Sequence, residues 1–328
     1  MLKIRALILI MFLIVSSVCL VRVGLVEANF MPLNIPPHSI EITSDGNITG
    51  TDRIICRDAE YEFTGNISGN IVIFCDNITI NGNGYWLEGN GESFGIFMEG
   101  IMGVTVKNLT ITNFATGVGF SYAPRNCGDD SLVGNTILNC TLGIFCYEVK
   151  GEITISRNQI SNCSTGIAAF EANNIYIYGN TIAYNNAAVS FAYGVDCFVY
   201  GNNFINNSAH IKSATVTWDN RRMGNFWSNY TGPDLNRDGI IDKFYMIDEN
   251  NIDHYPRMSL IPETSLILSP RDDEPQMPWT TVLAAVVSTG IAAVLVATLL
   301  LYRRNKNLKP YVEDPKNSDD AKKLPFEV

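Results

Sequence analysis

Histidine and positive charge are scarce in this sequence. It has 3 His and 23 Lys or Arg among its 328 residues. Residues 29–278 contain 13 Lys or Arg and 27 Asp or Glu, which gives a formal charge of 13 − 27 = −14. Nucleic-acid binding needs a basic surface, so we expect no nucleic-acid partner. No Cys-x-x-Cys pair occurs, so the ligand spacing that is typical of zinc sites is also missing.

Helical periodicity is missing from residues 134–211, which repeat a pattern of short strands instead. Each copy has an asparagine at the same aligned position, at offsets of 158 − 135 = 23, 180 − 158 = 22 and 202 − 180 = 22. A fixed period of this length, with apolar and polar residues alternating, is typical of solenoids built from strands. The aligned apolar columns are Ile153/Ile175/Cys197, Ile155/Ile177/Val199, Ile137/Ile160/Ile182/Phe204 and Ile144/Ile167/Val189/Ile211.

These columns predict an all-β fold, a right-handed parallel β-helix. Its coils would stack at the roughly 4.8 Å spacing of paired strands. Earlier segments repeat with a longer offset, since Ile78 recurs as Val104, 104 − 78 = 26 residues later. We therefore expect about seven coils over residues 54–211. The asparagines at 135, 158, 180 and 202 should form a ladder of amides along the axis. A chain of asparagine-rich loops is the alternative, but it would leave the four aligned columns unexplained.

The beginning of the chain has the pattern of an export signal. Lys3 and Arg5 precede an apolar run, and a small-residue cleavage site ends at Ala28. We interpret residues 1–28 as a signal peptide, with an uncleaved signal anchor as the alternative. Residues 29–53 then form an N-terminal extension.

The end of the chain has the pattern of a membrane anchor. A proline-rich linker, residues 259–278, leads to an uncharged apolar stretch at 279–302. That stretch is long enough to cross a bilayer core of about 30 Å as one helix. Arg303 and Arg304 begin the polar tail, residues 303–328, and basic residues next to a span stay in the cytoplasm. We expect a cell-membrane protein with its solenoid outside and its tail inside.

Aromatic residues crowd into the segment that follows the repeat. We interpret residues 212–258 as a cap, because a solenoid must cover its last coil. Three of its segments resemble the C-terminal signature of NosD-type right-handed β-helix proteins, a group that includes a periplasmic copper-binding protein and archaeal surface proteins. The resemblance covers about residues 40–258, implies the β-helix fold, and suggests copper only by analogy. The segments are Gly224-Asn225-Phe226-Trp227-Ser228-Asn229, Asp238-Gly239-Ile240-Ile241-Asp242 and Asp253-His254-Tyr255-Pro256.

One loop of this cap has the spacing of a calcium-binding loop. Asp234, Asn236, Asp238 and Asp242 lie in the pattern D-x-N-x-D-G-x-x-D, and the backbone carbonyl of Ile240 would be a further ligand. The twelfth position of an EF-hand-type loop should be a carboxylate, and in this sequence it is tyrosine. The pattern predicts a calcium site, with a turn that binds no ion as the alternative.

Cysteines and glycosylation sequons supply further candidate sites. Cys140 and Cys163 fall in one column of adjacent coils, so they either form a disulfide or fill the core as small apolar residues. The candidate glycosylation sites are Asn47, Asn66, Asn206 and Asn229.

Three functions from different classes fit this sequence. The first is a surface-anchored binding or structural module for carbohydrate or another component of the cell envelope. The second is a polysaccharide lyase or hydrolase, but Asp129-Asp130 is the one adjacent carboxylate pair in the coils, and no Gly-His-Gly motif accompanies it. The third is copper handling, for which His254 and Met258 form no cluster with other soft ligands. We favour the first, without catalytic residues and without copper.

Overall fold

The computed structural model describes residues 39–121, 128–192, 197–211 and 216–262, with the backbone alone for 209–211. All regular elements in these ranges are β-strands, and the ranges contain no helix that is long and apolar enough to span a membrane. The predicted signal peptide (1–28), membrane helix (279–302) and cytoplasmic tail (303–328) lie outside the described residues.

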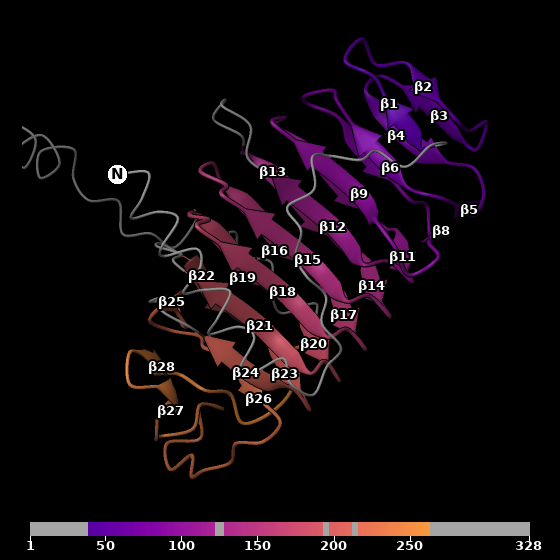
Figure 1. The fold of residues 1–328 in the computed structure, drawn as a ribbon. Helices are drawn as coiled ribbons and strands as arrows, with labels where there is room; N and C mark the ends of the chain where they lie inside the picture. Colours follow the sequence, from indigo (N-terminus) through magenta and orange to yellow (C-terminus); the bar gives the residue numbers. More distant parts are fainter. Residues whose placement is uncertain (1–38, 122–127, 193–196, 212–215, 263–328) are drawn as a thin grey trace, which may run out of the picture. The chain divides into compact units, whose positions relative to one another are not determined.

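Three sheets run along the described part of the chain and form a parallel β-solenoid of about seven turns (Figure 1). Sheet A consists, in spatial order, of β2 (Ile48–Thr49), β1 (Ile40–Ile42), β6 (Ile71–Ile73), β9 (Phe94–Glu99), β12 (Thr116–Ser121), β15 (Leu142–Tyr147), β18 (Thr165–Phe170), β21 (Ala187–Ala192) and β24 (Ser208–Ile211). Sheet B consists, from the opposite end of the solenoid, of β25 (Val216–Thr217), β22 (Cys197–Tyr200), β19 (Ile175–Tyr178), β16 (Ile153–Ser156), β13 (Asp130–Val133), β10 (Thr105–Lys107), β7 (Thr79–Asn81), β4 (Glu60–Phe63) and β3 (Ile54–Arg57). Sheet C consists of β26 (Phe226–Trp227), β23 (Asn203–Ile205), β20 (Thr181–Ala183), β17 (Gln159–Ser161), β14 (Thr136–Leu138), β11 (Thr110–Thr112), β8 (Trp86–Glu88) and β5 (Ile67–Ser68).

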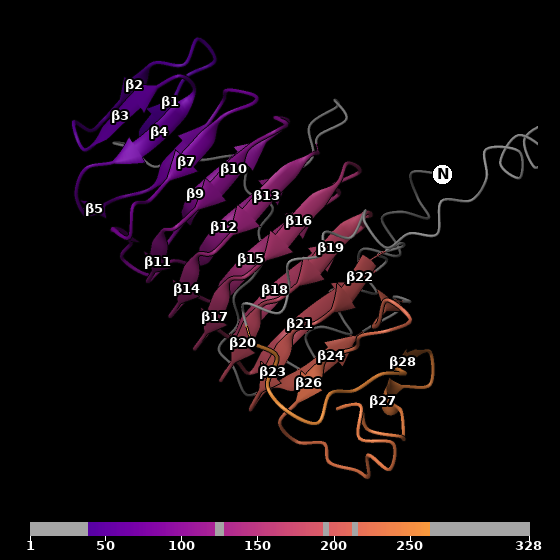
Figure 2. The same ribbon diagram turned by 180° about the vertical axis from the view of Figure 1, so that it is seen from behind.

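Each complete coil contributes one strand to each sheet, so strands that are neighbours in a sheet come from successive coils. Figure 2 shows this order for β7, β10, β13, β16, β19 and β22 of sheet B. Antiparallel pairs occur where the solenoid begins, with β1 against β2 and β3 against β4. A separate hairpin of β27 (Tyr245–Asp248) and β28 (Asn251–Asp253) belongs to the cap.

The strand register confirms three of the four predicted columns. Ile160 lies opposite Ile137 on one side and Ile182 on the other, and the column continues to Phe204. The Ile153 and Ile155 columns of sheet B also pair as predicted. Because alternate residues of a strand point to opposite faces, each column buries its apolar side chains between the sheets.

The fourth predicted column is wrong at its last member. Ile211 lies opposite Phe191 instead of Val189, because the register shifts between Ala187 and Ser190. The offset falls from 208 − 187 = 21 at Ser208 to 210 − 190 = 20 at His210. This last strand of sheet A is therefore out of step with the 22-residue period.

The solenoid also extends beyond both predicted boundaries. β1 joins sheet A in parallel with β6, inside the segment that the sequence assigned to an N-terminal extension (29–53). At the other end, β25 and β26 continue sheets B and C into the predicted cap. The sequence period does not reach β1 or β25, because their coils have different lengths: β1 pairs at an offset of 71 − 40 = 31 residues and β25 at 216 − 197 = 19. β26 keeps the period, at 226 − 203 = 23.

The corner after several strands of sheet C is one source of the many asparagines. Asn139, Asn162 and Asn206 take positive φ values of 56°, 54° and 49° there. Asparagine tolerates this left-handed conformation better than most residues with a side chain. Several sequons therefore arise from the turn itself.

Replacing Ile160 by Ala should lower the free energy of unfolding by about 2–5 kcal/mol, because it removes a buried side chain between Ile137 and Ile182. The measurement is denaturant unfolding. Gln159→Ala changes the exposed neighbour in the same strand and should cost much less. Equal losses in the two variants would contradict the inward position of Ile160.

Candidate functional site

A ladder of buried asparagine amides runs along the solenoid toward the cap. Asn135, Asn158, Asn180 and Asn202 form it as predicted, each Nδ2 donating to the Oδ1 of the next at 3.0–3.1 Å. Asn202 donates in the same way to Asn225, at 3.0 Å. The sequence contained a signal for this fifth member, because Gly224-Asn225 repeats the Gly-Asn pair at 201–202.

The ladder ends on the carboxylate of Asp253, a fully buried side chain in β28. Its Oδ2 accepts hydrogen bonds from the backbone N–H of Asn225 at 2.7 Å, from Asn225 Nδ2 at 3.3 Å and from Trp227 Nε1 at 2.9 Å. An ionised carboxylate only accepts, so it can close a chain in which every amide donates forward. Burial raises the pKa of Asp253 to about 6, although the bonds from Trp227 and Asn225 act against this rise.

Asp253 thereby fixes the indole around which the cap packs. The Trp227 ring stacks on Phe204, with centroids 4.4 Å apart and planes at 15°. Tyr245 packs on Trp227 with a centroid distance of 4.5 Å, and Tyr230 packs on Tyr245 at 4.9 Å. The apolar core of the last coil thus continues into the aromatic cap.

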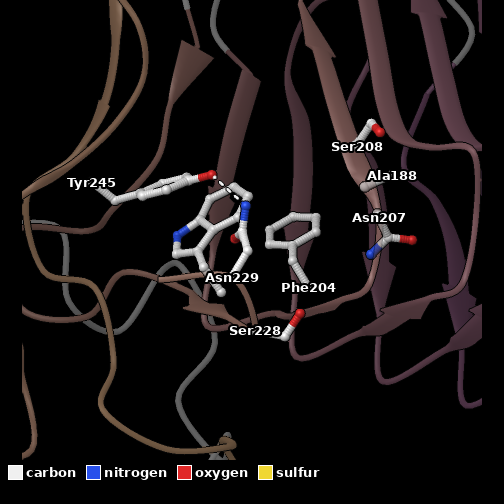
Figure 3. A pocket seen from close by; sticks show the side chains of 8 residues that line it. Ala188, Phe204, Asn207, Ser208, Ser228, Asn229 and Tyr245 are labelled. Atoms are coloured by element: carbon white, nitrogen blue, oxygen red, sulfur yellow. Dashed lines mark hydrogen bonds between the residues drawn. The ribbon is translucent and has the colours of Figure 1, made fainter. Parts of the chain in front are cut away.

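A pocket of about 180 Å³ opens where this aromatic stack meets the last coils (Figure 3). Sequence reasoning did not find it, because its residues come from four separate segments. None of its lining side chains has a formal charge. Asn229 Nδ2 lies 3.4 Å from the Tyr245 hydroxyl, and the exposed Ser208 and Ser228 add further hydroxyls. The lining consists of Ala188, Phe204, Asn207, Ser208, Trp227, Ser228, Asn229 and Tyr245.

The arrangement suits a small neutral ligand that has both an apolar face and hydrogen-bonding groups. Tyr245 presents an aromatic ring with a polar end, a combination that contacts such ligands well. Amide and hydroxyl groups can both donate and accept hydrogen bonds. They can therefore accept from the hydrogen of a ligand hydroxyl or donate to its oxygen. None of these lining residues is a carboxylate, histidine, lysine or arginine.

The predicted calcium loop is held by its own hydrogen bonds. Asp234 accepts the backbone N–H groups of Asp238 and Gly239, at 3.1 and 2.9 Å. Asp238 Oδ1 accepts from Ile240 N–H at 2.8 Å, and Asp242 Oδ2 accepts from the backbone of the residue after Asp234 at 2.7 Å. The fourth side-chain candidate, Asn236, donates to Asp238 Oδ2 at 2.9 Å. Calcium binding by this loop stays a prediction.

The candidate glycosylation asparagines differ in their surroundings. Asn47, Asn206 and Asn229 are exposed, whereas Asn66 is half-buried. Asn66 also accepts the backbone N–H of Trp86 at 3.2 Å. A glycan on Asn229 would begin at the rim of the pocket. Whether these sequons are used stays a prediction.

The two carboxylates of the lyase or hydrolase hypothesis lie in different environments. Asp129 is exposed, but Asp130 is buried in the column of sheet B that continues with Ile153. Asp130 Oδ1 accepts the backbone N–H of Val104 at 2.8 Å. Burial raises the pKa of Asp130 to about 7, while hydrogen bonds from Val104 and Gly103 act against this rise. A carboxyl enclosed in this way cannot reach a polysaccharide on the flank of the solenoid.

The fold and the strand register agree with a comparison to protein families. A family model described as periplasmic copper-binding protein (NosD) matches residues 61–232, more than half of the chain. The chain belongs to the NosD family. Members of this family are periplasmic or otherwise extracytoplasmic. No curated protein matches the chain.

The copper in the NosD family's description requires a test against the residues of this chain. Among the described residues, no three His, Cys, Asp or Glu side chains form a group that could hold a metal ion. His254 Nδ1 lies 2.9 Å from Asp219 Oδ2, and Met258 is exposed. Copper(I) needs thiolates, thioethers or imidazoles around one point. The described part of this NosD-type solenoid does not fit a copper centre.

If the loop of Asp234–Asp242 binds calcium, the ion should stabilise the cap by mass action, by about 2.7 kcal/mol at a hundredfold excess over Kd. The measurement is thermal unfolding with calcium and with chelator. Asp238→Ala should remove the difference, whereas Glu249→Ala, an exposed change outside the loop, should keep it. Identical melting with and without calcium in the unaltered protein would make the loop a simple turn.

The raised pKa values of Asp130 and Asp253 predict that stability falls as pH rises. Both carboxyls bind protons more tightly in the folded than in the unfolded chain, so their contribution is complete below about pH 4 and is lost between about pH 4 and 7. Asp130→Asn keeps the shape and an acceptor for Val104. It should reduce the difference between the free energies of unfolding at pH 5 and pH 8 by up to about 3 kcal/mol. An unchanged difference would contradict the burial of an ionisable Asp130.

Proposed function

We propose that this chain is a membrane-anchored, extracytoplasmic binding module, and that the pocket beside Tyr245 binds a neutral saccharide unit of the cell envelope. The observation that carries the proposal is the lining of the pocket, which combines aromatic rings with amides and hydroxyls and has no charged side chain. Sugar rings have an apolar C–H face and a rim of hydroxyls. Such a ligand matches both parts of this lining.

The charge of the chain supports a neutral ligand in preference to an acidic one. Residues 29–278 carry a formal charge of 13 − 27 = −14, which repels anionic polymers at long range. The pocket provides no arginine or lysine that could offset this repulsion. An uncharged saccharide is not repelled by this negative charge, because it has no net charge itself.

The anchor supports a role at the cell surface. The apolar stretch at 279–302 and the basic residues after it would hold the solenoid outside the membrane. A proline-rich linker between the two would let the pocket reach envelope components. A tethered module needs only modest affinity, because many copies can engage one polymer at the same time.

Tyr245→Ala should weaken binding of neutral oligosaccharides at least about tenfold, because it removes an aromatic contact. Tyr245→Phe should have a smaller effect, since only the hydroxyl that faces Asn229 is lost. The measurement is binding of the full chain to immobilised neutral and acidic glycans. Each variant is first checked for an unchanged melting curve.

Tyr184→Ala is the matched control, because Tyr184 is an exposed tyrosine that does not line the pocket. It should bind like the unaltered protein. Equal losses in the Tyr184 and Tyr245 variants, or no neutral glycan bound at all, would contradict the proposal. Cleavage of a bound glycan would favour the lyase or hydrolase alternative.

A further inference from the structure

Cys140 and Cys163 lie directly opposite each other in adjacent coils. The register on both sides fixes this position, because Leu138 pairs with Ser161 and Leu142 with Thr165. The backbone N–H of Ser164 also donates to the carbonyl of Cys140 at 3.2 Å. Neighbouring strands are about 4.8 Å apart, and the Cα atoms of a disulfide are separated by about 4.4–6.8 Å. The backbone therefore already has the separation that a disulfide requires.

The two thiols also face each other. Each thiol has the largest effect on the pKa of the other: the pKa of Cys140 is lowered by the neighbouring Cys163 thiol, and the pKa of Cys163 is raised by Cys140 and by burial. Both side chains are 4% exposed. They are free thiols in the structure, each 3.4 Å from the carbonyl of the second residue before it.

The neighbours in this column leave the pair no other sulfur partner among the described residues. One coil earlier the column contains the ring of Phe114, whose carbonyl accepts from Thr141. One coil later it contains Asn185, whose Oδ1 accepts the backbone N–H of Cys163 at 2.9 Å. The two sulfurs are thus enclosed between an aromatic ring and an amide.

We propose that Cys140 and Cys163 form a disulfide that links two successive coils when the protein matures outside the cytoplasm. Extracytoplasmic compartments oxidise cysteine pairs, and the NosD family is extracytoplasmic. The oxidant is an external disulfide, which exchanges with the pair while the coils close and before the sulfurs are buried.

The exchange proceeds in two balanced steps. The thiolate of Cys140 attacks one sulfur of the external disulfide, forms a mixed disulfide and releases one thiolate. Cys163 then loses its proton and attacks the sulfur of Cys140, which releases the second thiolate. Two protein thiols become one disulfide, and the external disulfide is reduced to two thiols.

The test is peptide mapping of the full chain, recovered from cells that export it and denatured in excess iodoacetamide without reductant. The expected product is one linked peptide containing Cys140 and Cys163, lighter than its two parts by two hydrogens. The same chain made in a reducing cytosol should give both cysteines alkylated. Alkylation of both cysteines in the exported protein, also after refolding with oxidised glutathione, would overturn the proposal.

Two variants separate this pair from the other buried thiols. Cys146→Ser removes an interior cysteine that lies opposite Ala169, so the linked peptide should persist. Cys163→Ser should leave Cys140 alkylated and abolish the linked peptide. A link from Cys140 to any other cysteine in that variant would count against a pair set by the register.

Discussion

Hydrogen bonding between successive coils is the constraint on which the rest of this structure depends. Each strand of the solenoid satisfies its backbone groups on the coil before it and the coil after it, so no coil can be completed alone. The amide ladder from Asn135 to Asn225 imposes the same condition on side chains. A buried amide without its partner costs more than a hydrogen bond contributes, so the register of every coil is fixed by the next.

This condition makes the end of the solenoid the most specialised part of the molecule. The last amide needs an acceptor that donates nothing further, and Asp253 supplies it from a hairpin far along the chain. The same carboxylate orients Trp227, and the aromatic rings of the cap pack on that indole. The pocket therefore follows from how the fold is closed, since its lining lies where the last coil and the cap meet.

The two buried carboxyls, Asp130 and Asp253, have different roles in the packing of the solenoid. Asp253 has several donors and ends the ladder, whereas Asp130 occupies a position that its column otherwise fills with apolar residues. Burial raises the pKa of both carboxyls, and neither residue lines the pocket. A perturbed pKa often marks a catalytic group, but in this solenoid it accompanies closure of the fold and packing of a coil.

The sequence by itself determined the fold class, the inward columns and the first four members of the amide ladder. These features repeat with a period of 22–23 residues, and a repeated local pattern can be read without knowing where the chain goes. The family resemblance rested on the signature of the cap, and the family comparison confirms it. The period could not extend to β1 and β25, whose coils differ in length, nor to Ile211, which follows a register shift.

Only the tertiary structure decided where Asp253 goes and that a pocket exists. Asp253 is separated from Asn225 by 253 − 225 = 28 residues without a repeat, and nothing in that spacing indicates that the two side chains meet. The pocket joins Ala188, Phe204, Ser228 and Tyr245 from segments that the sequence could describe only one by one. Contacts within a repeat are set by local periodicity, whereas contacts at its end depend on how a non-repeating segment folds back.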